Sequence, residues 1–332
     1  MKWIIPVLLI LMVSGCTVPG IGIEIPFLPD VFGGQTGTSD IVIIKQLNTY
    51  PEKIRKEQTI RVVAYIQNVG SKEKVGKGTT TQFSDKGITV KLYDYCTGVF
   101  NIKETACKGI TSGASDTCVI DRIYPQETVE VSWELESASQ SVNLETPCTL
   151  KVSAEYPYKT SVLSTINFIN EDEMRRMIED GSFKTKTSVQ TTGEGPVKPN
   201  IKVLEQQPIP AKASSSGNAI IEFEISDRGS GFVTQKIESP QTKYDLWVTE
   251  MEYTNKNSGS SCRFPEEDKD TPFSSVRKQI TLMREKSSII TCKLAKPPVS
   301  KERMDNMRMA IEYLYEVRKE KKVTLLPDAR NI

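Results

Sequence analysis

Apolar and polar residues alternate along many short segments of this chain, with the period of two that places every second side chain on one face of a β-strand. In residues 60–66, Ile60, Val62, Ala64 and Ile66 share one face. The same alternation is found in residues 128–135, 150–156, 219–225 and 311–317. Short alternating strands separated by turn signals are typical of antiparallel β-sandwiches. We therefore predict an all-β chain.

Two of these segments are predicted to form hairpins. A turn at Pro157 separates residues 150–156 from a returning strand at residues 162–168. A polar run follows residue 317 and precedes a last strand at residues 323–326. Just before this second hairpin, residues rich in Glu, Arg and Met predict at most a short helical turn over positions 300–309.

The pattern of strands occurs twice. Each copy has an opening strand, then proline, then an alternating strand, then a turn that contains Gly-Ser. In the first copy these features are residues 40–44, Pro51, residues 60–66 and the turn from Asn68 to Ser71. In the second copy they are residues 200–204, Pro208 and Pro210, residues 219–225 and the turn from Asp227 to Ser230. The repeat predicts two immunoglobulin-like β-sandwich domains in tandem, at residues 39–169 and 199–332.

A short helix is predicted between the two copies. Asn170 is a favourable N-cap with Glu173 three residues later, acidic residues fill the first turn, and Gly181 ends the pattern. A segment rich in Ser, Thr and Gly follows. We therefore assign residues 170–198 to a short helix and an inter-domain linker.

The composition argues against an enzyme and against a nucleic-acid partner. The chain of 332 residues has no histidine, which excludes a Ser-His-Asp triad, a Cys-His dyad and any metal site that uses histidine. Its 43 Lys and Arg residues against 42 Asp and Glu give a net charge of +1, with the two signs interspersed. We predict no catalytic residue, no cofactor, no metal site, no nucleic acid and no small-molecule substrate.

The first residues have the features of a secretory signal. Lys2 precedes an apolar run at residues 3–13, which as a helix reaches only about 17 Å, short of the roughly 30 Å hydrocarbon core of a bilayer. The run ends in Val-Ser-Gly-Cys16, which resembles the lipobox of bacterial and archaeal lipoproteins. The resemblance implies a signal peptide at residues 1–15, a lipid on Cys16 and a tether at residues 16–38. An ordinary cleaved signal peptide is the alternative.

The expected location is therefore the extracytoplasmic face of the cell membrane, where the lipid on Cys16 would hold the protein. The remaining six of the seven cysteines form an even set for disulfides in an oxidising compartment. Two pairs have the same spacing of 30 positions. Among the many pairings open to six cysteines, the repeat thus favours Cys118–Cys148, Cys262–Cys292 and, by elimination, Cys96–Cys107.

The first copy resembles the CARDB-type (cell-adhesion-related) immunoglobulin-like domains of bacterial and archaeal surface proteins. The resemblance covers roughly residues 39–168 and rests on the opening features of the repeat together with the strands at residues 90–93 and 131–133. The second copy keeps the opening half and the closing hairpin. The resemblance implies an extracellular adhesion, spacer or assembly role, and it brings no catalytic residues with it.

Three aromatic residues are candidate contacts with a protein partner. Trp247 lies between two apolar residues that are expected to take the core face, and Tyr93 and Tyr95 lie just before the first of the six cysteines. Trp133, on the apolar face of its strand, is expected in the core. The acidic residues 266–270 lack the spacing of an EF-hand loop and are expected to form a solvated loop.

The leading functional hypothesis is a membrane-anchored surface lipoprotein with a protein-interaction, adhesion or structural role and a protein partner at the cell surface. One alternative is an accessory lipoprotein subunit of an envelope transport or appendage-assembly complex. A remote alternative is a carboxylate-based hydrolase, for which the sequence offers no recognisable site.

Overall fold

Strands make up almost all of the regular structure, so the prediction of an all-β chain is confirmed. The computed structural model describes residues 39–327 except residues 72, 108–114, 138–143, 215–216, 239–240, 256–258, 266, 274–276 and 283–286. Within these residues the one α-helix is α2 (Glu171–Glu179). The predicted signal peptide and tether lie outside the described residues.

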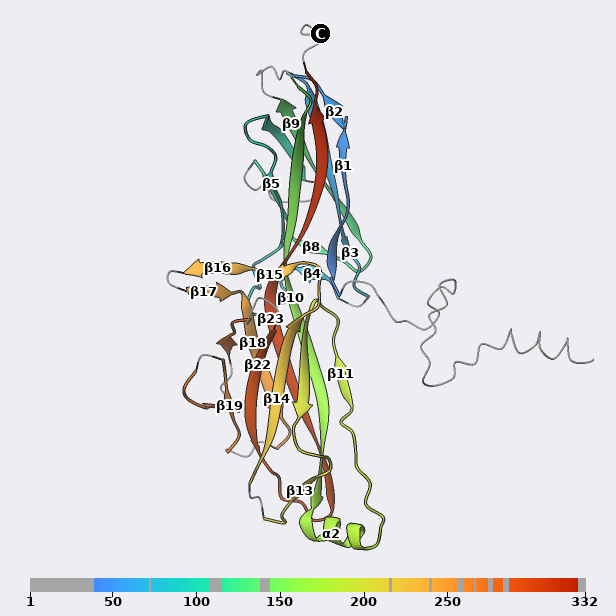
Figure 1. Cartoon of the computed structure of the whole chain (residues 1–332), viewed down its shortest axis with the longest axis vertical. Coiled ribbons are helices and arrows are strands. Elements are labelled where there is room, and N and C mark those ends of the chain that lie inside the picture. Colours follow the sequence, from blue (N-terminus) through green and yellow to red (C-terminus); the bar gives the residue numbers. More distant parts are fainter. Residues whose placement is uncertain are drawn as a thin grey trace, which may run out of the picture. The chain divides into compact units, whose positions relative to one another are not determined.

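Two strands are far longer than the others. β10 (Thr146–Asn170) has 25 residues and β23 (Glu302–Leu325) has 24. They pair antiparallel in one uninterrupted register, from Thr146 opposite Leu325 to Ile169 opposite Glu302. At about 3.3 Å per residue this β10–β23 ladder is roughly 80 Å long. The ladder passes through two successive β-sandwiches (Figure 1).

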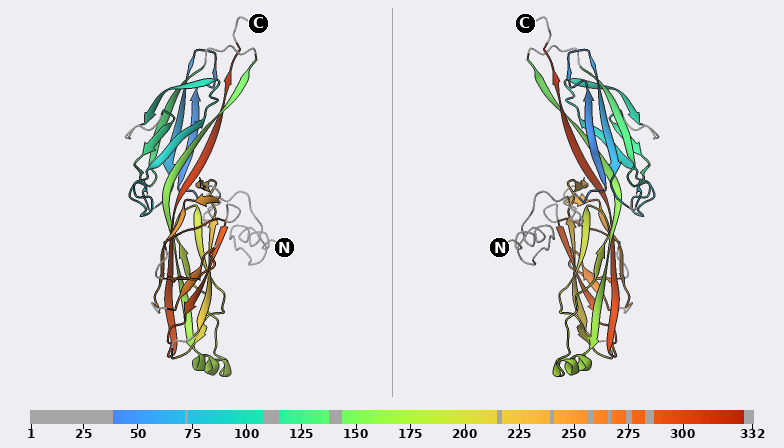
Figure 2. Two further views of the ribbon diagram at one scale, coloured as in Figure 1. Left: turned by 90° about the vertical axis from the view of Figure 1, so that its left-hand side faces the viewer. Right: turned by 90° about the vertical axis from the view of Figure 1, so that its right-hand side faces the viewer.

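The first sandwich has one sheet with the order β1-β3-β9-β6 and a second sheet with the order β7-β5-β10-β23. Figure 2 shows these two sheets as separate layers. Besides the ladder, its main strands are β1 (Val42–Tyr50), β3 (Thr59–Asn68), β5 (Ile88–Asp94), β6 (Phe100–Cys107), β7 (Thr117–Ile120) and β9 (Thr128–Ser137). Three shorter strands complete it: β2 (Lys53–Ile54), β4 (Val75–Gly76) and β8 (Arg122–Ile123).

The second sandwich has one sheet with the order β12-β14-β22-β19-β20 and a second sheet with the order β21-β18-β23-β10. Its main strands are β12 (Val197–Val203), β14 (Asn218–Asp227), β18 (Leu246–Tyr253), β19 (Ser261–Arg263), β20 (Thr271–Pro272), β21 (Lys278–Gln279) and β22 (Ser287–Ala295). Its shorter strands are β11 (Gln190–Thr192), β13 (Ile209–Ala211), β15 (Phe232–Val233), β16 (Gln235–Glu238) and β17 (Gln241–Tyr244).

The two sandwiches exchange strands reciprocally. β10 starts in the first sandwich, between β5 and β23, and ends in the second sandwich on the far side of β23. β23 starts in the second sandwich, between β18 and β10, and ends in the first. Two short strands also pair with a strand of the other copy. β2 pairs parallel with the end of β23, and β13 pairs parallel with the end of β10. Each sandwich therefore takes one of its strands from the other copy of the repeat.

This exchange corrects the predicted domain boundaries. Residues 157–169 belong to the second sandwich, and residues 317–325 belong to the first; Tyr315 and Glu316, which pair with β15, lie at the join. The predicted linker is also part of the second sandwich, because β11 pairs with β10 and Lys186 forms a bridge with Gln207. The repeat itself is present in the structure, but residues 39–169 and 199–332 are not two separate folding units.

The predicted turn at Pro157 is wrong, because β10 continues through this residue. Pro157 lies opposite Leu314, whose N–H donates to Asp245 and whose carbonyl accepts from Thr234, so neither group needs a partner on β10. On its other side β10 pairs with β5 only up to Glu155 and with β11 only from residue 162 onwards. Proline fits here because no ladder hydrogen bond requires its missing N–H.

The predicted polar turn and helical turn near the C-terminus are wrong as well, because β23 is continuous from Glu302. In the polar run, Lys319 donates to the carbonyl oxygens of Ile44 and Lys45 at 3.1 and 2.8 Å, and Lys321 pairs with Glu52 at 2.6 Å. These partners from the start of the chain allow a charged run to remain in a strand.

The buried apolar side chains form one cluster that continues through both sandwiches. In β10 every even-numbered residue from Cys148 to Phe168 is buried, so the inward face keeps its phase along the whole strand. Trp133 is fully buried, which confirms its predicted place in the core. Helix α2 begins as predicted, with the side chain of Asn170 accepting from the N–H groups of Asp172 and Glu173.

Candidate functional site

Four tyrosines lie at the centre of the β10–β23 ladder, where the two sandwiches join. Tyr156 lies opposite Tyr315 and Tyr158 opposite Tyr313, with ring centroids 5.9 and 6.2 Å apart. Tyr313 and Tyr315 are 6.3 Å apart. Edge-on and tilted contacts at these distances stabilise aromatic pairs beyond their burial. We call these four residues the tyrosine cluster.

Burial keeps the phenols of the tyrosine cluster protonated. It raises the pKa of Tyr156, Tyr158, Tyr313 and Tyr315 well above the ordinary value, and nearby carboxylates raise that of Tyr315 further. The Tyr315 hydroxyl donates to the carboxylate of Asp227 at 3.0 Å. The cluster thus provides fixed hydrogen-bond groups and no titration near neutral pH.

The Gly-Ser turn of the second copy closes on the start of the first. Asp40, which is 4% exposed and precedes β1, accepts from the backbone N–H of Ser230 at 3.1 Å and from its hydroxyl. Asp227 accepts from the N–H of Gly229 at 3.0 Å, which shapes the turn. Next to Asp40, the N–H of Ile41 reaches the Tyr156 hydroxyl at 3.4 Å.

The Gly-Ser turn of the first copy makes the corresponding contact with the start of the second. Glu194, which precedes β12, accepts from the backbone N–H of Ser71 at 3.0 Å and from its hydroxyl. Asn68 accepts from the N–H of Gly70 at 2.9 Å. The Asp40–Ser230 and Glu194–Ser71 contacts therefore follow the same reciprocal rule as the exchanged strands.

Two glycines let the backbone approach the tyrosine cluster closely. A Cβ atom on Gly229 would lie 2.1 Å from the Tyr315 hydroxyl and 2.4 Å from Asp40. A Cβ on Gly195, which has a φ of +134°, would lie 2.7 Å from the Tyr313 hydroxyl. Only glycine fits at these places, because any side chain would overlap the hydroxyls.

A loop of the first copy also covers a buried charge in the second sandwich. Glu312 is fully buried, and its Oε2 accepts from the N–H groups of Thr81 and Gln82 at 2.9 and 2.6 Å. Lys159 lies 3.8 Å from the other carboxylate oxygen and also pairs with Glu250. A carboxylate held in this way links the loop of the first copy to the sheet of the second sandwich.

The three aromatic residues predicted to contact a partner differ in how far their side chains are exposed. Trp247 is partly exposed on the outer face of β18, and its neighbours Leu246 and Val248 are fully buried, as the sequence predicts. Tyr93 is 37% exposed, and the guanidinium of Arg318 lies 5.2 Å from its ring centroid. Tyr95 instead packs against the core. Trp247 and Tyr93 thus remain available for contact, whereas Tyr95 is largely taken up by internal packing.

The acidic residues near position 270 are paired with basic side chains. Asp270 lies 3.3 Å from both Arg263 and Lys293, and Glu267 lies close to Lys278. Hydrogen bonds from Lys293 lower the pKa of Asp270. Glu266 lies outside the described residues. Among the described residues no group of three or more Cys, Asp or Glu side chains is placed to hold a metal ion.

All six expected cysteines form disulfides, but two of the three predicted pairings are wrong. The bonds are Cys96–Cys148, Cys107–Cys118 and Cys262–Cys292. The third was predicted, and it joins residues directly opposite each other on β19 and β22. Cys118 and Cys148 cannot pair, since β5 lies between β7 and β10 and strands two apart are separated by roughly 10 Å. Their equal spacing with Cys262 and Cys292 is a coincidence.

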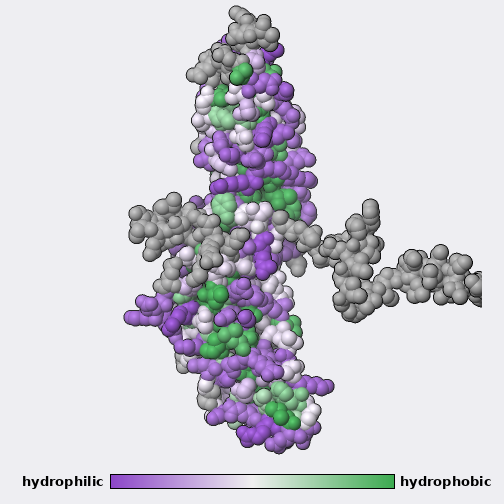
Figure 3. All heavy atoms as spheres, viewed as in Figure 1, coloured by the Kyte–Doolittle hydropathy of each residue, from purple (hydrophilic) through white to green (hydrophobic). Residues whose placement is uncertain are grey.

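Three disulfides indicate an oxidising environment outside the cytoplasm. Within the described residues no helix is long and apolar enough to cross a membrane. On the face drawn in Figure 3, hydrophilic residues surround small apolar patches. Cys16 lies outside the described residues, so its lipid remains a prediction.

No family model matches the chain, and no curated protein matches it. Among solved structures, a collagen adhesin (CNA) from S. aureus aligns over 87% of this chain and 88% of that chain, with 9% sequence identity and a TM-score of 0.11. An alignment with this score carries no argument about fold or function. The resemblances to CARDB-type domains and to lipoproteins therefore stay predictions from the sequence.

Sequence reasoning missed Asp40, Glu194 and Glu312, the carboxylates that join the two sandwiches. For Asp40 and Glu194 a signal was present, since each precedes the opening strand of its copy and each copy has a Gly-Ser turn. For Glu312 the only signal was a charged residue amid the apolar positions of residues 309–317.

Proposed function

We propose that this protein is a lipid-anchored extracytoplasmic surface protein with a structural or protein-interaction role, whose two immunoglobulin-like sandwiches act as one rigid spacer. The observation that carries the proposal is the β10–β23 ladder. Because both strands pass from one sandwich into the other without a break, no flexible linker separates the sandwiches. A rigid body of this kind suits a spacer or scaffold better than a hinged receptor.

Three further observations support the proposal. The three disulfides fit an oxidising compartment, and the Val-Ser-Gly-Cys16 motif fits lipid attachment there. The carboxylates of Asp40, Glu194 and Glu312, which join the two sandwiches, are each used in a structural contact. The partly exposed Trp247 offers a surface contact for a partner.

The anchor is tested by replacing Cys16. In detergent phase partitioning, Cys16→Ala should move the mature protein from the detergent phase to the aqueous phase, while the matched variant Thr17→Ala should stay in the detergent phase. Retention of Cys16→Ala in the membrane fraction would show that the N-terminus acts as a signal anchor and would overturn the lipid assignment.

The role of the protein is tested by crosslinking in intact membranes followed by mass spectrometry. Loss of the main crosslinked partner on Trp247→Ala, at unchanged protein level, would support a contact through this face. A stoichiometric link to an envelope transport or assembly complex would favour the accessory-subunit alternative. Turnover of a glycan or ester in a hydrolase screen would contradict the assignment as a non-enzyme.

A further inference from the structure

The second sandwich has an outer face on the sheet that contains β12, β14 and β22. In each of these strands buried residues alternate with residues that point away from the core. Leu204, which follows β12 and is 47% exposed, donates its backbone N–H to the carbonyl of Ile220 at 3.2 Å, so two apolar side chains lie side by side there. We call the outer side chains of β12 and β14 the β14 face; its central members are Asn200, Lys202, Leu204, Ile220, Glu222 and Glu224.

Opposite charges lie next to each other on the β14 face. Lys202 of β12 lies directly opposite Glu222 of β14, and Asn200 lies opposite Glu224. The side chains of Lys202, Glu222 and Glu224 make no ion pair and no hydrogen bond with another residue that the structure describes. Both signs of charge on this face are therefore available to a partner.

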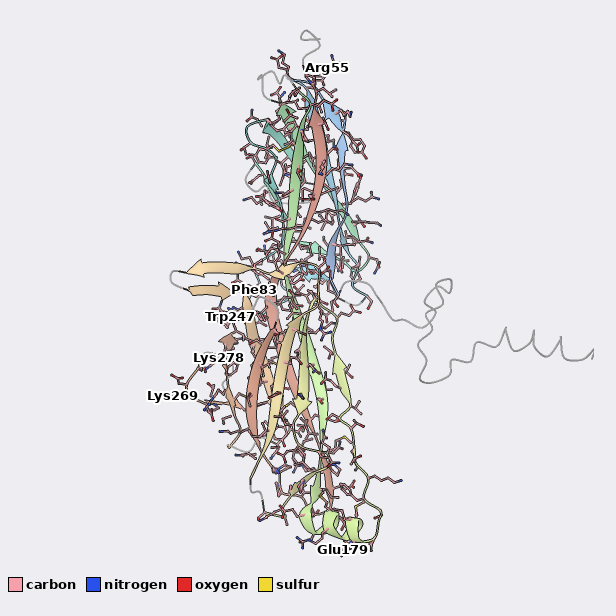
Figure 4. The ribbon with its side chains drawn as sticks, in the orientation of Figure 1. Arg55, Phe83, Glu179, Trp247, Lys269 and Lys278 are labelled. Carbon is pink, nitrogen blue, oxygen red and sulfur yellow. A yellow bond between two sulfur atoms is a disulfide. The ribbon has the colours of Figure 1, made fainter. Side chains whose placement is uncertain are left out.

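Two other sheets are less suited to pairing with a second copy of themselves. Figure 4 shows Trp247 and Lys278 on the other sheet of the second sandwich, to which the loop of the first copy is bonded through Glu312. On the β1-β3-β9-β6 sheet of the first sandwich, Glu104 lies opposite Glu134, and neither has an ion pair among the described residues. Two like charges side by side repel the same two charges on a second copy.

We propose that the β14 face packs on the β14 face of a second copy of this chain, around a twofold axis that runs parallel to the strands between β12 and β14. β12 of each copy then lies over β14 of the other, at the spacing of about 10 Å that is usual for stacked sheets. Lys202 lies against Glu222 of the second copy, and Leu204 lies against Ile220 of the second copy. By symmetry each of these contacts is made twice.

The arrangement of charges selects this axis. Lys202 has Glu222 beside it in its own sheet and Glu222 of the second copy across the interface, so four charges of alternating sign surround the axis. An axis across the strands would instead place Glu222 against Glu224 of the second copy, where the two carboxylates repel. The side-chain oxygen of Asn200 accepts from Gln190 at 2.7 Å, which leaves its amide N–H groups to donate to Glu224 of the second copy.

The charge pairing is tested by exchange of charges in the full-length protein purified in detergent, with dimerisation measured by sedimentation velocity. Lys202→Glu and Glu222→Lys each place like charges across the interface twice, so each variant alone should associate roughly tenfold more weakly than the parent. An equal mixture of the two variants pairs opposite charges again and should recover the dimer. Lys103→Glu, which changes the charge of a lysine on β6 of the first sandwich, is the control and should associate like the parent.

The apolar contact is tested with two leucines of nearly equal exposure. Leu204→Asp places a carboxylate against Ile220 of the second copy and should weaken the dimer roughly tenfold. Leu163→Asp is the matched control, because Leu163 is 46% exposed and lies on β10 of the other sheet; it should leave the dimer unchanged. A parent protein that is monomeric at all concentrations, equal weakening by the two leucine variants, or no recovery in the mixture of charge variants would each overturn the proposal.

Discussion

Ser230 donates its backbone N–H to the carboxylate of Asp40, which lies 190 residues earlier in the chain, at 3.1 Å. The hydroxyl of Ser230 donates to the same carboxylate. Ser71 makes the same two hydrogen bonds to Glu194. Each contact joins the turn of one copy of the repeat to the start of the other. The two contacts differ in burial, since Asp40 is buried and Glu194 is partly exposed.

This difference in burial predicts unequal effects on stability. Asp40→Ala removes a buried carboxylate that accepts hydrogen bonds from the N–H and the hydroxyl of Ser230, and it should reduce the free energy of unfolding by about 2–3 kcal/mol. Glu194→Ala, the matched change at the more exposed contact, should cost about 1 kcal/mol or less. Denaturant unfolding of the oxidised proteins measures both. Equal losses would contradict the stronger role of the buried contact.

Gly229 should tolerate no side chain. In Gly229→Ala the new Cβ would lie 2.1 Å from the Tyr315 hydroxyl, so the turn and the tyrosine cluster must move apart. We expect a loss of about 2–3 kcal/mol of unfolding free energy, typical of overpacking at a closely packed position. Gly98→Ala is a suitable control, because no heavy atom lies within 4 Å of its Cβ position. Thermal unfolding of the two variants, with the three disulfides of each intact, would detect the difference.

Strand exchange predicts that neither copy of the repeat folds alone. A chain of residues 39–169 lacks the part of β23 that borders β10 in the first sandwich, and a chain of residues 199–332 lacks β10 in the second. Both pieces should show no cooperative unfolding, whereas the whole body, residues 39–332, should unfold in one transition. Circular dichroism with heating checks this. A stable, cooperative piece of either kind would be evidence against the exchange.

The disulfides are predicted to connect Cys96 with Cys148 and Cys107 with Cys118, which non-reducing peptide mapping resolves. Their sequence separations are 52 and 11 residues. In the loop-closure estimate the longer bond stabilises by about 4 kcal/mol and the shorter by about 3 kcal/mol. The double variant Cys96→Ser/Cys148→Ser should therefore unfold more readily than Cys107→Ser/Cys118→Ser. The reverse order would indicate that loop closure does not dominate.

Acid should weaken the contact between Lys159 and Glu250. The hydrogen bond from Lys159 lowers the pKa of Glu250, with Arg308 adding a smaller effect; Glu312 faces the same lysine. A carboxylate with a lowered pKa contributes stability above its ordinary pKa near 4.3, and this contribution is lost as the pH falls through the folded value.

Glu250→Gln should therefore show a smaller loss of stability between about pH 5 and pH 3 than the parent protein. Other paired carboxylates also titrate there, so the difference between variants is the measurement. The control Glu252→Gln keeps the Lys159–Glu250 pair and should lose stability like the parent. Identical acid profiles for parent and Glu250→Gln would show that the pair contributes nothing.

The sequence was sufficient to predict the strands and the repeat, because alternation reports which face of a strand is buried. Ile60, Val62, Ala64 and Ile66 are all fully buried, and Trp247 lies outward between buried neighbours. Asn170 caps the predicted helix. Each of these features depends on residues within a few positions of one another.

The sequence was not sufficient to predict the exchange, because its causes lie far apart in the chain. Judged from its neighbours in the sequence alone, Pro157 predicts a turn. It fits within β10 because the backbone groups of Leu314, which lies opposite, bond to Asp245 and Thr234. In the same way, the charged run after Val317 predicts a turn from its composition. It remains in β23 because Lys319 donates to carbonyl oxygens of β1. Disulfide pairing failed for the same reason, since strand order decides which cysteines are neighbours.

The place where the first strand begins determines how a pull on the N-terminus is transmitted. Asp40 is held by Ser230 beside the tyrosine cluster, so tension from the preceding residues reaches the fold at the midpoint of the β10–β23 ladder. There the load meets the buried carboxylate of Asp40 and its hydrogen bonds to Ser230 before it reaches the pairing of β1 with β3. If the proposed lipid on Cys16 is the anchor, the Asp40–Ser230 contact would be the first part of the fold to carry the load.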